Sequence, residues 1–189
     1  EAHILTVISA KVLNIPYVMS RRSLRNYQFR SRFYRYLELF LHRFIDVAVG
    51  NSEKVCDELI GEGLSPGSVR LLYSGVEDLR HDLPLIKESR ESTMAPFRLC
   101  VVANLIEYKG HADLLTAVYY LKKRSLELRV DFVGSDLGER KRLENQVIEL
   151  GLEDSIVFHG RLDQPQAIAS LSDICLLVSH EEGFSNSLL

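Results

Sequence analysis

The chain has 189 residues, of which 46% are hydrophobic and 26% are charged, and its formal net charge is −3. This composition is typical of a globular protein, and the length allows one large domain or two small ones. No apolar run approaches the about 18 residues that a membrane-spanning helix needs, so we expect no segment that crosses a membrane. Because the chain starts at Glu1, without an initiator Met or a signal peptide, we also expect it to be part of a longer protein.

Three cysteines, Cys56, Cys100 and Cys175, lie far apart among apolar neighbours. Their spacing is typical neither of a zinc site nor of a disulfide framework. We therefore expect buried, reduced thiols, which suits a protein of the reducing cytoplasm.

Basic residues are concentrated near the amino terminus. Residues 1–50 carry a net charge of +5, which leaves −8 for the remainder. Six arginines fall between Arg21 and Arg35 and alternate with aromatic residues. This pattern is typical of a surface that binds phosphate, nucleic acid or an acidic membrane leaflet. It is equally typical of a solvated helix face whose arginine stems cover aromatic side chains.

The first part of the chain predicts alternating helices and strands. Hydrophobic periodicity and the positions of Gly and Pro predict, in chain order, a helix over 2–13, a strand over 16–19, an arginine-rich loop, a helix over 28–43, a strand over 46–50, a helix over 53–60 and a strand over 69–73. Asn51 and Ser52 are candidate caps for the helix that follows them, and Gly61 and Gly63 end it.

A charged, proline-bounded segment over 78–96 predicts a linker between two domains. A second alternation follows it, with strands over 98–103, 128–133, 156–158 and 174–178 and helices over 111–124, 139–150 and 164–171. Short apolar strands that alternate with helices predict right-handed βαβ units and a parallel sheet. Both halves are therefore expected to be Rossmann-like, although neither contains GxGxxG. Ligands of such sheets bind at the carboxyl ends of the strands.

Three of the predicted loops contain candidate ligand-binding groups, and one of them carries His159, Gly160 and Arg161. Lys109 and Gly110 stand just before a helix, where a lysine could meet a phosphate or could simply be exposed. Gly183 begins a segment that resembles a helix start, whose free N–H groups attract anions. The two preceding acids, Glu181 and Glu182, could bind hydroxyl groups or only cap that helix. An anion clamp beside a carboxylate suits a sugar linked to a diphosphate.

Several ordered motifs resemble the carboxyl-terminal domain of family 4 retaining glycosyltransferases. They are VVANLIEYKGHADLLTAV (101–118), VDFVGSD (130–136), IVFHGRLD (156–163) and SDICLLVSHEEGFSNSLL (172–189). Upstream, NIPYVMSRRSL, IDVAVGNSEKV and VRLLYSGVE resemble the back half of that family's amino-terminal domain. The resemblance implies an α/β protein of GT-B type with parts of two Rossmann-like parallel-sheet domains. Residues 1–77 would belong to the amino-terminal, acceptor-side domain and residues 97–189 to the nucleotide-sugar-binding domain, joined by the linker.

The resemblance also implies roles for individual residues. Lys109 matches the lysine that contacts the donor diphosphate, and Glu182 matches a glutamate that contacts donor sugar hydroxyls; these two are the candidate catalytic residues. The family often has an arginine at Asn104, and its second glutamate would follow Leu189. The implied donor-binding set comprises Asn104, Lys109, Gly110, Gly134, Gly160, Arg161, Leu162, Glu182, Gly183, Phe184, Ser185 and Asn186.

On this resemblance, the parent enzyme transfers a hexosyl unit from a nucleoside diphosphate sugar to an acceptor hydroxyl with retention, in polysaccharide or glycolipid biosynthesis. The acceptor would be a saccharide or lipid-linked, with no cofactor or metal required and no nucleic acid partner. Arg21, Arg22 and Arg25 could contact the acceptor or the inner face of a membrane. The 189-residue chain alone is expected to be inactive. Two alternatives remain, a nucleotide-sugar epimerase of similar fold and a non-catalytic nucleotide-binding fragment.

Overall fold

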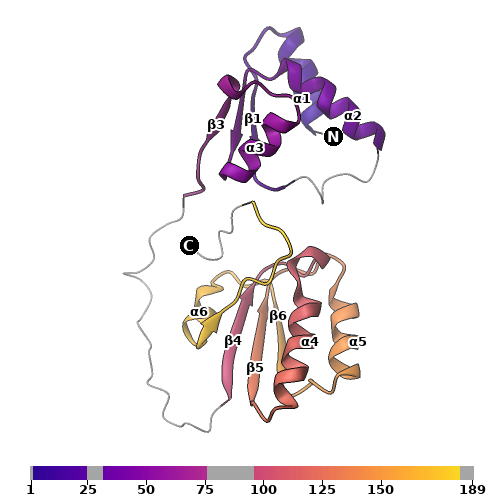
Figure 1. Cartoon of the computed structure of the whole chain (residues 1–189), viewed down its shortest axis with the longest axis vertical. Coiled ribbons are helices and arrows are strands. Elements are labelled where there is room, and N and C mark those ends of the chain that lie inside the picture. The colour runs from indigo at the N-terminus through magenta and orange to yellow at the C-terminus, as the bar shows by residue number, and fades with distance from the viewer. Residues whose placement is uncertain (1, 25–31, 76–95, 184–189) are drawn as a thin grey trace. The chain divides into compact units, whose positions relative to one another are not determined.

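The computed structural model describes residues 2–24, 32–75 and 96–183. The chain divides into two compact units, one formed by Glu1–Val76 together with Glu182 and Gly183, the other by Glu77–Glu181. Each unit contains a parallel sheet with helices (Figure 1), which confirms the prediction of two Rossmann-like α/β regions. The predicted linker over 78–96 lies outside the described residues except for its last position.

The first unit contains a three-stranded parallel sheet in the order β1-β2-β3. Its elements are α1 (Ala2–Val12), β1 (Val18–Arg21), α2 (Arg32–Leu41), a 3-10 turn (His42–Phe44), β2 (Val47–Gly50), α3 (Glu53–Gly61), a second 3-10 turn (Pro66–Ser68) and β3 (Val69–Leu71). Helix α3 begins where predicted because the Ser52 hydroxyl accepts a hydrogen bond from the Val55 N–H. Ala48 of β2 is fully buried with Val55 and Leu59 of α3 in the core of this unit.

Strand β1 lies two residues later than predicted. The Tyr17 N–H donates to the Asp46 carboxylate (2.7 Å) rather than to a neighbouring strand, so the ladder starts at Val18, which pairs with Val47. The strand consequently includes Arg21, which the sequence placed in a loop.

Arg21 is buried, and this corrects its assignment to a membrane- or acceptor-facing surface. Its side chain is 6% exposed and pairs with Glu62 at 2.6 Å and with Glu58 at 3.6 Å. A buried guanidinium needs such partners because desolvation of a charge is costly. Arg22 is exposed, and Arg25 lies outside the described residues.

The second unit contains a four-stranded parallel sheet in the order β6-β5-β4-β7. Its elements are β4 (Phe97–Val102), a 3-10 turn (Glu107–Lys109), α4 (His111–Lys122), β5 (Leu128–Val133), α5 (Arg140–Glu149), β6 (Ile156–Gly160), α6 (Gln166–Ser170) and β7 (Ile174–Cys175). All four strands run parallel, as the alternation of strands and helices predicted.

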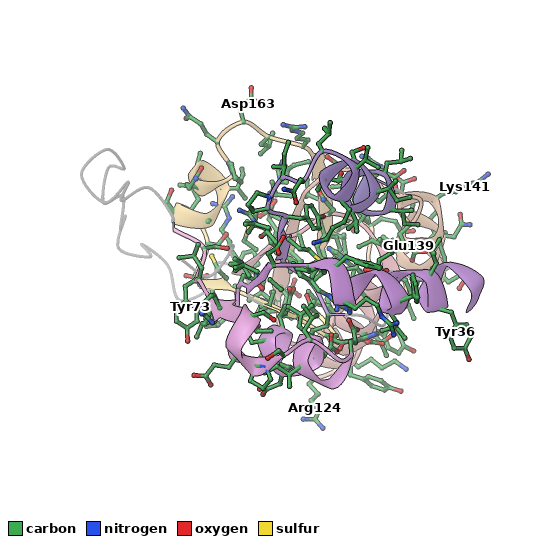
Figure 2. All side chains as sticks on the ribbon, turned by 90° about the horizontal axis from the view of Figure 1, so that it is seen from above. Tyr36, Tyr73, Arg124, Glu139, Lys141 and Asp163 are labelled. Carbon is green, nitrogen blue, oxygen red and sulfur yellow. The ribbon has the colours of Figure 1, made fainter. Side chains whose placement is uncertain are left out.

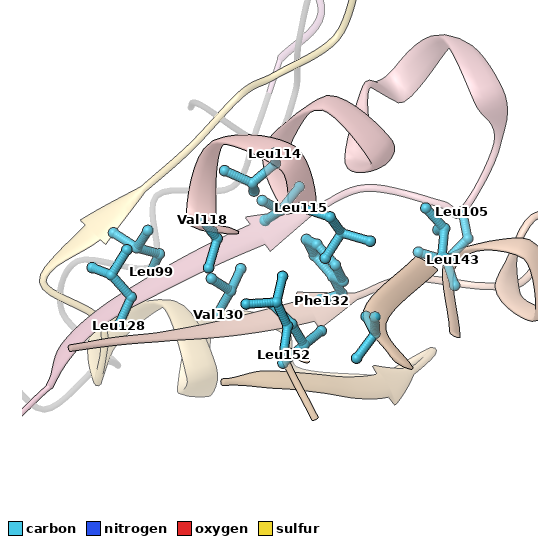
Figure 3. Close-up of a cluster of buried hydrophobic side chains, with 13 residues drawn as sticks. Leu99, Leu105, Leu114, Leu115, Val118, Leu128, Val130, Phe132, Leu143 and Leu152 are labelled. Atoms are coloured by element: carbon cyan, nitrogen blue, oxygen red, sulfur yellow. The ribbon is translucent and has the colours of Figure 1, made fainter. Parts of the chain in front are cut away.

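Helices α4 and α5 pack on one face of this sheet. Figure 3 shows Leu115 and Val118 of α4 beside Val130 of β5, and all three side chains are buried. Leu143 of α5 is buried in the same cluster. Apolar residues at alternate strand positions and at three- to four-residue helix spacing produce this single core.

Three strands of this unit differ from the prediction, and β4 begins and ends one residue earlier than expected. Strand β6 continues to Gly160, where Val133 pairs with Gly160 across an irregular register and Gly160 adopts a φ of +70°. Strand β7 contains only two residues, although the Leu176 N–H still donates to the Cys100 carbonyl oxygen (2.8 Å); further on, the His180 N–H donates to the Tyr108 carbonyl oxygen (2.8 Å). The predicted strand to Val178 is therefore too long.

Candidate functional site

The amino terminus of α4 lies at the carboxyl end of β4 and carries the predicted phosphate-binding lysine. Lys109 ends a 3-10 turn, and Gly110 in left-handed conformation (φ +71°) starts the helix. Lys109 is partly exposed, and its Nζ lies 5.1 Å from the centre of the Tyr108 ring. The N-cap residue of α4, Gly110, contributes no side-chain hydrogen bond to the helix start. A helix amino terminus in this state favours an anion, and a lysine beside it adds positive charge.

The amino terminus of α5 differs, because a carboxylate of the chain already binds it. Asp136 Oδ1 accepts hydrogen bonds from the N–H groups of Gly138 (2.8 Å), Glu139 (3.1 Å) and Arg140 (3.1 Å). Hydrogen bonds from backbone N–H groups lower the pKa of Asp136, and the bond from Arg140 has the largest effect. Of these two helix starts, α4 is therefore the one suited to a ligand phosphate.

Asn104, Gly134 and Gly160 lie together at the carboxyl ends of β4, β5 and β6. Asn104 Oδ1 accepts a hydrogen bond from the Ser135 N–H (3.0 Å), and the Gly134 N–H donates to the Gly160 carbonyl oxygen (2.9 Å). A Cβ on Gly134 would lie 2.1 Å from the Ala103 carbonyl oxygen. These residues hold adjacent loops together at the edge where ligands bind in such sheets.

The segment after β7 packs against the start of α4. A Cβ on Gly110 would lie 2.0 Å from the Val178 carbonyl oxygen. Nearby, His180 Nε2 lies 2.5 Å from the Asp113 carboxylate. These contacts, with the backbone hydrogen bond from His180 to Tyr108, fix the residues that immediately precede Glu181 and Glu182.

Two histidines lie beneath the candidate site. His111 is 2% exposed, and its ring packs edge-on against Phe132. Burial, followed by the charge of Lys109, lowers the pKa of His111 to about 4, so it is neutral at physiological pH. His159 Nε2 lies 2.7 Å from the Asp131 carboxylate, which is buried on β5. This pair anchors the end of β6, where the predicted base-contacting residues begin.

The other predicted residues occupy different positions. Arg161 is exposed after β6, and Leu162 is partly exposed. Glu182 and Gly183 are partly exposed and belong to the first unit, whereas Lys109 belongs to the second. Phe184, Ser185 and Asn186 lie outside the described residues. The carboxylates of Asp113, Asp131 and Asp136 were missed by sequence reasoning; an Asp inside the apolar strand LRVDFV was the available signal.

Within 2–24, 32–75 and 96–183, no group of three or more His, Cys, Asp or Glu residues is arranged to hold a metal ion. In the same ranges, no helix combines the length and hydrophobicity needed to cross a membrane.

Comparison with solved structures shows the fold of the chain. HepE from Anabaena, solved with UDP-glucose, matches with a TM-score of 0.79 at 22% identity, over 99% of this chain and 53% of its own. Sucrose-phosphate synthase from Thermosynechococcus elongatus matches with a TM-score of 0.71 at 21% identity, over 97% and 50%. A glycosyltransferase from Rickettsia africae gives 0.66 at 18%, over 98% and 57%. The chain thus spans about half the length of these relatives.

These neighbours are glycosyltransferases of the GT-B fold, and the two parallel-sheet units are part of that fold. Residues 84–189 match the family described as glycosyl transferases group 1. Because the match covers more than half of the sequence, the chain belongs to the group 1 glycosyl transferases. A comparison with curated protein sequences found no match.

Proposed function

We propose that the chain is part of a retaining family 4 glycosyltransferase that transfers a hexosyl unit from a nucleoside diphosphate sugar to an acceptor hydroxyl. The observation that carries this proposal is the amino terminus of α4, where Lys109 adjoins a helix start whose N-cap residue is the glycine Gly110. This group lies at the ligand-binding edge of a parallel sheet in a group 1 glycosyl transferase. HepE, which shares the fold, was solved with UDP-glucose.

Chemically, this arrangement would stabilise the diphosphate as it leaves the sugar. Negative charge grows on the leaving group in the transition state, and Lys109 with the N–H groups of α4 would oppose it. Glu182 would bind donor sugar hydroxyls, and the loop from Gly160 to Leu162 would contact the base. These groups supply positive charge and hydrogen bonds without a metal ion, so we propose metal-independent transfer.

The acceptor would be a saccharide or a lipid-linked saccharide, in polysaccharide or glycolipid synthesis. Arg22 remains the described candidate for contact with an acceptor phosphate or an anionic membrane surface, because its side chain is exposed. Arg21 is excluded from that role by its ion pairs with Glu62 and Glu58.

Donor binding tests the role of Lys109. In the full-length protein, we expect Lys109→Ala to weaken binding of the cognate nucleoside diphosphate sugar by roughly 2 to 3 kcal/mol, the scale of a charge-assisted hydrogen bond. Isothermal titration calorimetry across a panel of donors measures it. Lys141→Ala is the matched control, because Lys141 points outward from α5 (Figure 2). Equal donor affinity in the two variants would contradict the proposed site.

The products distinguish the candidate reactions. NMR of the glycosylated product should show the anomeric configuration of the donor if transfer occurs with retention, and the opposite configuration would refute retention. Sugar interconversion without any acceptor would indicate an epimerase. Tight donor binding with neither reaction, across a broad panel of acceptors, would favour the non-catalytic alternative. Turnover that survives a strong chelator is expected, and its loss would contradict metal independence.

A further inference from the structure

Strand β6 contains a bulge directly before the loop that is proposed to contact the nucleobase. Phe132 of β5 pairs with Phe158 of β6, and the next residue of β5, Val133, pairs with Gly160. Strand β6 therefore has one residue more than β5 at this point, and the extra residue is His159. Such bulges are common beside active sites, where they change the direction of a strand and of its side chains.

The side chain of His159 contacts a buried carboxylate on the neighbouring strand. His159 Nε2 lies 2.7 Å from Asp131 Oδ1. Because a carboxylate only accepts hydrogen bonds, Nε2 is the donor. The Asp131 side chain is 3% exposed. Arg129 Nε lies 3.7 Å from the same oxygen, which is too far for a hydrogen bond. The imidazole of His159 therefore holds Asp131 at a distance that the guanidinium does not reach.

Three consecutive residues fix the end of β6. The ring of Phe158 lies 5.3 Å from that of Phe132, which Figure 3 shows in the core between the sheet and its helices. Asp131 precedes Phe132 on β5, so it lies on the opposite face of the sheet and binds His159 there. The Gly160 carbonyl oxygen accepts a backbone hydrogen bond from the residue after β5 (2.9 Å). The direction in which the chain leaves β6 is thus fixed on both faces of the sheet.

The contribution of this pair to stability does not explain its presence. A buried carboxylate loses its hydration, and attraction to a partner often only offsets that loss. Well-packed apolar residues in place of a buried charged pair are often equally stable or more stable. Val130, Phe132 and Val133 beside Asp131 are apolar and buried, so an apolar residue would suit this strand. What Asp131 and His159 add is a fixed orientation of the strand end.

We propose that Asp131 and His159 are positioning residues that hold the loop from Gly160 to Leu162 in the conformation that recognises the donor base. This inference rests on the proposed function, in which that loop contacts the base. Asp131 acts through His159, and His159 acts through the backbone of Gly160. Hydrogen bonds weaken steeply when donor and acceptor are misaligned. A loop therefore discriminates between bases only when the directions of its polar groups are fixed.

Binding to the full-length protein tests the proposal, with UDP, CDP, GDP, ADP and inorganic pyrophosphate as ligands. The four nucleotides share ribose and diphosphate, so differences among their affinities report on the base. Pyrophosphate reports on phosphate binding near Lys109. The double variant Asp131→Leu/His159→Leu removes the hydrogen bond without leaving a buried carboxylate unpaired. Its preference for the best over the worst base should fall about tenfold, the scale of one hydrogen bond, while its pyrophosphate affinity changes less than about twofold.

Three single variants complete the test. His159→Gln should retain most of the base preference, because its amide N–H can still donate to Asp131. Glu153→Gln, at an exposed position on the turn before β6, is the matched control and should retain all of it. His159→Leu, judged by the same two measurements, decides the question if the double variant does not fold. Equal losses of nucleotide and pyrophosphate affinity, or an unchanged base preference, would overturn the proposal.

Failure of the proposed function gives a different result. If the wild-type protein binds all four nucleotides no more tightly than pyrophosphate, the base contact itself is refuted, and this inference is refuted with it. If the wild-type protein prefers one base and the double variant keeps that preference, only the positioning role of Asp131 and His159 is refuted.

Discussion

At the scale of single residues, position 110 requires glycine for two separate physical reasons. Its φ of +71° favours glycine, and any Cβ would collide with the Val178 carbonyl oxygen at 2.0 Å. Gly151 has a similar φ of +63° with no atom within 4 Å of the added Cβ. The pair therefore separates backbone strain from steric collision.

We expect Gly110→Ala to destabilise the second unit by about 3 kcal/mol, because the backbone must shift as well as adopt a strained conformation. Gly151→Ala should cost only about 1 kcal/mol, from conformation alone. Chemical denaturation measures both values. Equal losses would show that the segment after β7 does not press on Gly110.

His111 gives the second unit a pH-dependent stability. Its pKa is lowered from 6.5 to about 4, so the unfolded chain takes up a proton at a higher pH than the folded chain. Its contribution is therefore complete above about pH 6.5 and is lost as the pH falls toward 4, by up to about 3 kcal/mol. His111→Gln should flatten this part of the stability profile, as measured by urea unfolding at successive pH values. An unchanged slope would contradict the burial of a neutral imidazole.

At the scale of elements, the start of α5 depends on one side chain, Asp136, which accepts three backbone hydrogen bonds. Asp136→Ala should lower the melting temperature, and Asp136→Asn should lower it less because Asn also caps helices. Since these bonds lower the pKa of Asp136, the stabilisation should be present above the pKa of the unfolded chain and fade as acid protonates the carboxylate. Asp163→Ala, at an exposed loop carboxylate (Figure 2), is the control. Equal melting of the Asp136 and Asp163 variants would refute the cap.

Most elements were predictable because their residues carry local signals. Strand β5 falls at the predicted residues, and α3 follows its Ser52 cap. The ends that were wrong depend on distant groups. The Tyr17 N–H, just before β1, donates to the Asp46 carboxylate, and after β7 the His180 N–H donates to the Tyr108 carbonyl oxygen. A sequence pattern does not reveal such contacts between segments far apart.

The candidate site was predictable to a similar degree. The position of Lys109 just before a helix was predicted correctly. The burial of Arg21 was not foreseen, because its partners Glu58 and Glu62 lie on and just after another helix, about forty positions along the chain. The Asp113–His180 contact was also missed, since both residues are exposed and ordinary in sequence.

At the scale of the whole molecule, the exposed apolar side chains of α1 bear on whether copies of the chain associate in solution. Leu5, Ile8 and Val12 recur on one face of α1 and are exposed by 68%, 52% and 79%. Clustered apolar side chains in water favour association. We therefore expect the 189-residue chain to self-associate, with concentration-dependent mass in light scattering. Ile8→Gln combined with Val12→Gln should reduce the effect, and Ile148→Gln on α5 should not. A wild-type monomer at high concentration would contradict this.

The pairing of β4 with β7 also determines when the second sheet can be completed during protein synthesis. The Arg98 N–H donates to the Asp173 carboxylate, 75 positions later in the chain. A ribosome that adds about 5 to 20 residues per second therefore needs roughly 4 to 15 s between these two residues. During that interval the apolar edge of β4 has no strand beside it, and such edges attract other chains. The nascent protein is thus most in need of chaperones before β7 emerges.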